Sequence, residues 1–435
     1  MRADDALDSG LRPSPERGLW LLLNKPYLPP DFDQQAFDNL WRVWEEPLHS
    51  QAEKATAEER RALAFARYGL TPRPDEPTKP MQYVVDGRGQ WTMNCLACHQ
   101  GKLTGHAYPG LPNSHFALET LTSDMRRTKL WSGKPLTRMD MGSLVMPLGT
   151  SNGTTNAVMF GVALMNYRDA DLNIVRNRPP PKMTHHDCDA PPWWNVHRKK
   201  RLYADDFAPR GHRVLMQFFL VEENGPDKFR EWEDDYRHIE AYINSLRAPK
   251  YPFAIDGQLA EAGRLAFNAH CAECHGTYGP DREYPERIVP IDEVGTDRVR
   301  LDALSVEHRT GYARSWFNHY GERAIVADPG GYVAPPLDGV WASAPYFHNG
   351  SVPTLWHLLH ANERPAVWRR VADKFDEARV GLEIEIAETP VSGSFAQKRQ
   401  YFDTTRFGKS AAGHLFPNRL DAGEKRAILE YLKTL

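Results

Sequence analysis

Two short motifs contain the residues whose types and spacing are best suited to chemistry. Both read C-x-x-C-H, and their members are Cys95, Cys98 and His99, then Cys271, Cys274 and His275. Two thiols at this spacing reach the two vinyl groups on one edge of a porphyrin, and the histidine that follows lies under the iron as its proximal ligand. The pattern therefore predicts two covalently bound haem c groups, with His99 and His275 as metal ligands.

Structural zinc and a thiol redox pair are the alternatives for these motifs. Zinc would need two further ligands at short spacing, but the next histidine after His275 is His308 and no cysteine follows. A thioredoxin-like pair needs a βαβ context and no trailing histidine. The fifth cysteine ends the segment His185-His186-Asp187-Cys188, which could bind a metal. We expect this Pro-rich loop to pack over a haem edge instead.

Composition excludes two classes of protein. The chain has 435 residues, with 54 basic against 57 acidic, and this near-neutral balance argues against nucleic acid as the main partner. The apolar run Leu19 to Leu23 is far too short to cross a bilayer. The polar start Met1 to Asp5 contains no leader. Because haem c is attached outside the cytoplasm, we expect a periplasmic or otherwise extracytoplasmic protein whose leader is absent from this sequence.

Helical periodicity surrounds the second motif. Residues 258–270 have apolar side chains at helical spacing, and a last helix is expected over 421–434 with Asp421 and Glu424 as a capping box. In a cytochrome c fold the first and last helices cross closely. Gly263 is the expected crossing point.

The first half of the chain repeats the second at low identity. Residues 191–206, which begin Pro-Pro, align without a gap against residues 335–350, which also begin Pro-Pro. Residues 239–246 likewise match 428–435. Such a repeat predicts two units of the same architecture.

These patterns predict a mainly α fold with two tandem cytochrome c-like domains, an N-terminal extension and long loops. We expect the extension over 1–80, the first domain over 81–247 and the second over 248–435. The extension contains a helix that begins after Thr56. Residues 82–90 are expected to form a hairpin or loop, so no regular helix directly leads the first motif.

The segment Ala334–Leu355 resembles a motif of the bacterial di-haem cytochrome c peroxidase superfamily. This group includes the methylamine-utilisation di-haem enzyme and the haem-dependent rubber oxygenases, and the Trp341 variant of the motif is closest to the rubber-oxygenase branch. The resemblance covers roughly residues 95–435. It implies two haem c groups, a Ca²⁺ ion, a small cytochrome or copper protein as redox partner, and hydrogen peroxide or dioxygen as a small oxidant.

The resemblance also implies ligands for the C-terminal haem. In the superfamily the sixth ligand lies just before the last helix, where this chain has Gly413-His414. We expect His414 to be that ligand. His348 is expected to contact the haem through a hydrogen bond, and ligation by His348 is the alternative.

The N-terminal haem is where the sequence departs from the superfamily. His106 and His115 are candidates for a distal histidine, and His115 has the more familiar spacing; it would act as an acid–base group or a removable ligand. In the rubber oxygenases the distal face of this haem has no protein ligand, and aromatic side chains surround it. Phe218 could be one of these aromatic side chains. The position of the inter-haem tryptophan is occupied by Ala204.

Three functions are compatible with this sequence. A closed C-terminal haem would transfer electrons, while an open N-terminal haem would activate hydrogen peroxide or dioxygen in a peroxidase or in an oxygenase acting on an apolar alkene. The third possibility is a pure periplasmic electron carrier with both haems six-coordinate. We expect the N-terminal haem to lack a strong sixth ligand, because the loop that carries His414 in the second half has no clear counterpart before Ile239. His212 lies further upstream, before the apolar run Val214 to Val221, and would need a different loop path to reach the iron.

Overall fold

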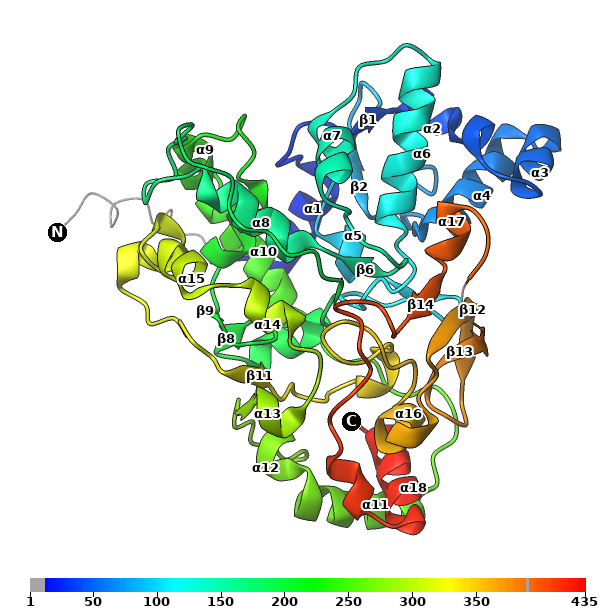
Figure 1. Cartoon of the computed structure of the whole chain (residues 1–435), viewed down its shortest axis with the longest axis vertical. Helices are drawn as coiled ribbons and strands as arrows, with labels where there is room; N and C mark the ends of the chain where they lie inside the picture. The colour runs from blue at the N-terminus through cyan, green and yellow to red at the C-terminus, as the bar shows by residue number, and fades with distance from the viewer. Residues whose placement is uncertain (1–11, 389–390) are drawn as a thin grey trace.

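The computed structural model describes residues 12–388 and 391–435 (Figure 1). Most of its helices are short, and long connections join them. The α-helices are α1 (Pro15–Asn24), α2 (Gln34–Asp38), α3 (Leu48–Lys54), α4 (Ala57–Tyr68), α5 (Leu96–His99), α6 (Leu118–Trp131), α7 (Arg138–Val145), α8 (Ala157–Asn166), α9 (Pro226–Glu231), α10 (Glu233–Ser245), α11 (Gly257–His270), α12 (Ala272–His275), α13 (Ile291–Val294), α14 (Val299–Ala303), α15 (Val306–Ala313), α16 (Leu355–Leu359), α17 (Phe395–Lys398) and α18 (Ala422–Leu432).

The prediction of a mainly α fold is wrong. The structure is 42% helix and 13% strand, so the strands are too numerous for that class. Two sheets have three strands, in the orders β1-β3-β2 and β13-β12-β14, and the other sheets have two. The strands that form the larger sheets are β1 (Phe32–Asp33), β2 (Tyr83–Val85), β3 (Gln90–Met93), β12 (Val367–Asp376), β13 (Gly381–Ile386) and β14 (Tyr401–Asp403); the short pairs are β4 (Lys102–Leu103) with β5 (His106–Ala107), β6 (Thr154–Thr155) with β7 (Cys188–Asp189), β8 (Arg201–Leu202) with β9 (Ala208–Pro209), and β10 (Ile288–Pro290) with β11 (Gly331–Val333).

The helix pair in the C-terminal half has the predicted crossing. Helix α11 lies beside α18 (Figure 1), and a Cβ atom at Gly263 would be 1.9 Å from the carbonyl oxygen of Ala427. Only glycine permits this approach of two backbones. Asp421 and Glu424 form the predicted capping box at the start of α18.

A second helix pair in the N-terminal half has the same geometry. Helix α1 packs on α10, and a Cβ atom at Gly18 would be 2.2 Å from the carbonyl oxygen of His238. His238 corresponds to Ala427 in the alignment of the two halves, so the two crossings are equivalent. Residues 15–24 lie in the segment that the sequence assigned to the extension, yet they pack as α11 does. The boundaries at residues 80 and 247 stay predictions.

The remaining N-terminal residues form a hairpin and a small aromatic core. Strands β2 and β3 pair in antiparallel register at the predicted hairpin, and Thr56 and Glu59 cap α4. Trp91 is fully buried and stacks on Phe37 at 4.4 Å between ring centres. This region rests on the first motif, because Cys98 packs against its core.

The two halves share one hydrophobic core. The indole nitrogen of Trp194 donates to the carbonyl oxygen of Asp338 at 2.7 Å. The side-chain amide of Asn195 donates to the carbonyl oxygen of Pro336 at 2.9 Å. The two aligned Pro-Pro segments therefore contact each other. Within the described ranges, no helix combines the length and apolar character needed to cross a bilayer.

Candidate functional site

The two C-x-x-C-H motifs have the same local structure. Each ends in a one-turn helix, α5 or α12, and each motif histidine bonds through Nδ1 to a proline carbonyl. The distance is 3.1 Å from His99 to Pro191 and 2.9 Å from His275 to Pro335. A carbonyl only accepts, so Nδ1 carries the proton and Nε2 keeps its lone pair for a metal. The two prolines are aligned positions of the repeat, so the proximal sides match.

The protonation states suit haem attachment. Burial lowers the pKa of His99 to about 4, and burial also lowers the pKa of His275, so both rings are neutral ligands at pH 7. Burial raises the pKa of the Cys95 and Cys98 thiols to about 12. A reactive redox pair needs thiolates, which these surroundings disfavour. The first motif therefore fits a thioether-linked haem better than a thiol redox pair.

His414 faces His275 across a gap of the right size for one metal. Their ring centres are 6.2 Å apart. An imidazole nitrogen lies about 2 Å from a first-row metal and the ring centre about 1 Å further, so two rings on one iron are about 6 Å apart. Nδ1 of His414 is buried and has no hydrogen-bond partner within the described residues. Burial lowers the pKa of this ring to about 3, so it too is a neutral potential ligand.

The backbone at His414 is held in an unusual conformation. His414 has a φ of 50° and Gly413 a φ of 82°, both in the left-handed region. The amide of His414 donates to the carbonyl oxygen of Val294 at 2.6 Å. A Cβ atom at Gly413 would lie 2.2 Å from the backbone of Gly295, so a larger residue there would displace the loop. The ring position thus depends on contacts between two distant segments.

His348 lies elsewhere, and its side chain is half-buried. Its ring stacks on Tyr332 at 4.3 Å between centres, and its Nε2 has no hydrogen-bond partner among the described residues. Its neighbour Phe347 has its ring 6.2 Å from that of His414. Of the two histidines, His414 is the one whose ring faces His275.

The candidate distal histidines of the N-terminal motif have other partners. Nε2 of His115 donates to the carbonyl oxygen of Ala372 at 2.8 Å, and Nε2 of His212 lies 2.9 Å from a carboxylate oxygen of Glu233. His106 is exposed. Each of these two half-buried imidazoles therefore uses the nitrogen that most often binds a haem iron.

Phe218 lies at the edge of an apolar surface that sequence reasoning missed. Its ring is 37% exposed and lies beside Gly161 of α8. The nine-residue segment Ala157–Met165 contains no polar residue and is longer than the run at Leu19, yet only Met159 in it is fully buried. This uninterrupted apolar run was the available signal. Next to it, α7 exposes large apolar side chains, namely Met141, Leu144 and Val145.

The His185–Cys188 loop has a structural role. Asp187 is fully buried and pairs with Lys409 at 2.7 Å, which ties this loop to the C-terminal half. His185 adds a contact to the same carboxylate at 3.2 Å. No cluster of three or more His, Cys, Asp or Glu suited to a metal ion occurs in the part of the chain that the structure describes. The expected Ca²⁺ ion stays a prediction.

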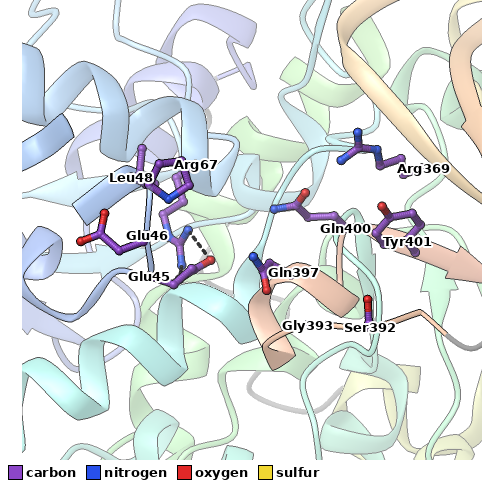
Figure 2. Close-up of a pocket in the computed structure, with 11 residues that line it drawn as sticks. Glu45, Glu46, Leu48, Arg67, Arg369, Ser392, Gly393, Gln397, Gln400 and Tyr401 are labelled. Carbon is purple, nitrogen blue, oxygen red and sulfur yellow. Dashed lines mark hydrogen bonds and ion pairs between the residues drawn. The ribbon is translucent and has the colours of Figure 1, made fainter. Parts of the chain in front are cut away.

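A polar cavity of about 400 Å³ lies away from both motifs. It opens to the surface between the α3–α4 region and the segment that contains α17 and β14 (Figure 2). Arg67 is already paired with Glu45 at 2.9 Å, and no motif residue lines the cavity. This cavity is therefore not the haem site.

Comparison with known proteins agrees with the motifs. A family model described as "RoxA-like, cytochrome c-like" matches residues 331–369. Two uncharacterized proteins of Sinorhizobium fredii are similar to the chain. The protein y4iM is 32% identical over 45% of this chain and 53% of its own length. The protein y4iJ is 38% identical over 44% of this chain and 42% of its own length. The chain spans about half the length of these curated relatives. Together with the motif geometry, the matched family supports a relationship with the di-haem cytochrome c proteins and a redox protein that binds haem c.

Proposed function

We propose that the chain is a di-haem c-type oxidoreductase with an electron-transfer haem on His275 and a reactive haem on His99. The carrying observation is the difference between the two distal sides. His414 faces His275 at the spacing of two imidazoles on one iron, whereas His115 and His212 are bonded to other groups. An iron with two strong axial ligands transfers electrons, and an iron with an open face binds a small oxidant.

The residues of the chain have separate tasks in this proposal. The four cysteines hold the two porphyrins by thioether bonds, and the proline carbonyls orient the proximal rings through Nδ1. His414 closes the C-terminal site to exogenous ligands. The bound haem of the N-terminal site supplies one-electron and oxygen chemistry. The chain contributes a neutral proximal imidazole there and a distal side free of a strongly bound histidine.

Two oxidants are compatible with such a site, and one observation favours dioxygen with an apolar organic substrate. Half-buried α8 lies beside Phe218 and beside Gly142 of α7, a helix with exposed apolar side chains, and a peroxidase acting on peroxide does not need such apolar surface. This area supports an oxygenase that cleaves an apolar alkene. A peroxidase that receives electrons from a small redox protein is the alternative, as is a carrier with both haems closed. Cytochrome c-like domains are commonly extracytoplasmic, and we propose the same for this chain.

The spin states of the oxidised holoprotein test the proposal. We expect one low-spin and one high-spin haem by electron paramagnetic resonance, and His414→Gly should convert the low-spin haem to high-spin. Two low-spin haems in the unmodified protein would favour the electron carrier. An unchanged spectrum in His414→Gly would reassign the ligand to His348. Turnover assays with peroxide plus reduced donor, against dioxygen plus an alkene, separate the two enzymatic hypotheses.

A further inference from the structure

Arg364 is a half-buried cation that has no acidic partner. It follows the short 3-10 helix Ala361–Glu363, and burial lowers its pKa to about 10, so it remains charged at pH 7. No carboxylate among the described residues pairs with it. An arginine desolvated without a counter-charge is expensive to maintain unless its donors are satisfied, so the positions of its acceptors are informative.

The acceptors of Arg364 are four main-chain carbonyls from two segments. On one side, Nε donates to His357 at 2.9 Å and Nη2 to Leu358 at 3.3 Å, both near the end of α16. On the other side, Nη1 donates to Ala411 at 2.6 Å and to Gly413 at 2.8 Å. The last carbonyls of a helix have no partner within the helix, so α16 provides a fixed anchor for the guanidinium. The planar fork of arginine can bond two separate segments at once.

The second segment ends at His414. Both of its bonded carbonyls lie within three residues of that imidazole, and the loop adopts left-handed backbone angles at Gly413 and His414. Such conformations persist only where surrounding contacts enforce them. Arg364 also lies over the ring of Phe347 at 5.1 Å, and that ring borders His414 at 6.2 Å. The guanidinium therefore contacts both the backbone and the side-chain surroundings of the candidate ligand.

We propose that Arg364 is a positioning residue that holds the 411–414 loop so that His414 closes the C-terminal haem. This inference rests on the proposed ligation by His275 and His414. Without the clamp, the bond from His414 N to Val294, the packing of Gly413 on Gly295 and the bonds of Ser410 to Asp297 and Asn349 remain. Among the described residues, Arg364 alone donates to the carbonyls of Ala411 and Gly413, which flank the turn into His414. The loop then relaxes, and the imidazole no longer stays on the iron.

Two substitutions in the holoprotein separate geometry from charge. Arg364→Gln removes both the fork and the charge, and Arg364→Lys keeps the charge but presents a single ammonium that cannot span two segments. We expect both variants to lose most of the low-spin signal of the C-terminal haem, and free imidazole added to either should restore it. Apparent cyanide affinity of that haem should rise by about tenfold or more, because cyanide no longer competes with a clamped ligand. The matched control is Arg369→Gln, which changes an arginine of the nearby strand β12 whose side chain is 37% exposed and paired with Glu385.

The outcomes distinguish this inference from the function on which it rests. If His414→Gly changes the spin state and Arg364→Gln does not, His414 is the ligand and the clamp is refuted. If Arg364→Lys keeps the wild-type spectrum while Arg364→Gln does not, charge rather than geometry is responsible, and the clamp is again refuted. A lower melting temperature with an intact low-spin signal would assign Arg364 a purely structural role. If His414→Gly itself leaves the spectrum unchanged, the proposed ligation fails first.

Discussion

Substitution of Gly18 by alanine should destabilise the protein, because it separates the two backbones of the N-terminal helix crossing. The new Cβ atom would be 2.2 Å from the carbonyl oxygen of His238 and 2.8 Å from Cβ of Tyr242. The first contact is with main chain, which cannot rotate away, so α1 must shift on α10. Overpacking of this kind costs about 1–3 kcal/mol. Alanine in place of glycine favours a helix by about 0.5–1 kcal/mol, so a net loss of about 1–2 kcal/mol is expected.

The shift also affects the core, since α1 contributes three leucines to it. Leu21, Leu22 and Leu23 are 0%, 1% and 9% exposed. Full burial of one such side chain contributes about 1.5–3 kcal/mol. A truncation that removes residues 1–24 should therefore destabilise the N-terminal half far more than Gly18→Ala does. A dispensable extension would give neither effect.

Thermal unfolding of the holoprotein, followed by circular dichroism, measures these effects. Gly87→Ala is the matched control, because no atom lies within 4 Å of a Cβ placed there. Gly263→Ala should behave like Gly18→Ala, since its Cβ would be 1.9 Å from the carbonyl oxygen of Ala427. If Gly18→Ala unfolds at the same temperature as Gly87→Ala, the equivalence of the two helix crossings is refuted.

Two further predictions concern the haem and the pH. Changing Cys271 and Cys274 together to serine should reduce the mass of the holoprotein by one haem, and mass spectrometry of a double variant that keeps both haems would contradict the attachment site. Burial opposes the charge of Glu233, but hydrogen bonds from His212 and Arg213 outweigh it and lower the pKa of this carboxyl to about 2. Because the pKa of Glu233 is lower in the folded state, its charge stabilises the fold at pH values above the ordinary pKa of 4.5. This stabilisation is lost as the pH falls toward 2. Glu233→Gln should therefore destabilise the protein by up to about 3 kcal/mol at pH 7 and much less near pH 3, and equal losses at both pH values would refute the assignment.

The parts of the structure that sequence reasoning anticipated rest mostly on local patterns, on the repeat and on the expected cytochrome c fold. The helix over 258–270 shows clear periodicity, and the capping box of α18 joins two residues three positions apart. The crossing at Gly263 joins helices far apart in the sequence, and the expected fold rather than any spacing predicted it. The structure explains the Pro-Pro alignment, because the carbonyl oxygens of Pro191 and Pro335 accept the hydrogen bonds that orient the two motif histidines. Short-range patterns and internal repeats carry this information directly.

What was missed depends on long-range contacts or on a pattern that was overlooked. Helix α1 contacts α10 across more than 200 residues, as the bond from Ser14 to His238 illustrates. Because a long segment separates α1 from the first motif, the sequence did not indicate that α1 belongs to the same helix pair as α10. The strand β13 reads Gly-Leu-Glu-Ile-Glu-Ile, an alternation that signals a half-buried strand, but the helical expectation hid it. Arg364 donates to the carbonyls of Ala411 and Gly413, which follow it by 47 and 49 positions in the sequence. No spacing rule connects an arginine to such a distant carbonyl.

The difference between the two halves follows from where their ligands lie. The proximal histidines are on one-turn helices, and a proline carbonyl accepts from each ring, so both halves have these features. The distal residues instead lie on connections, which diverge freely because they do not form the helix crossings. In the C-terminal half this connection is a strained loop held by Arg364 and Val294, which places His414 opposite His275. In the N-terminal half the corresponding interval contains α9 and no histidine between residues 213 and 237. A repeat with equal proximal sides can thus support one closed and one open haem through loop changes alone, which is the division of tasks that we propose.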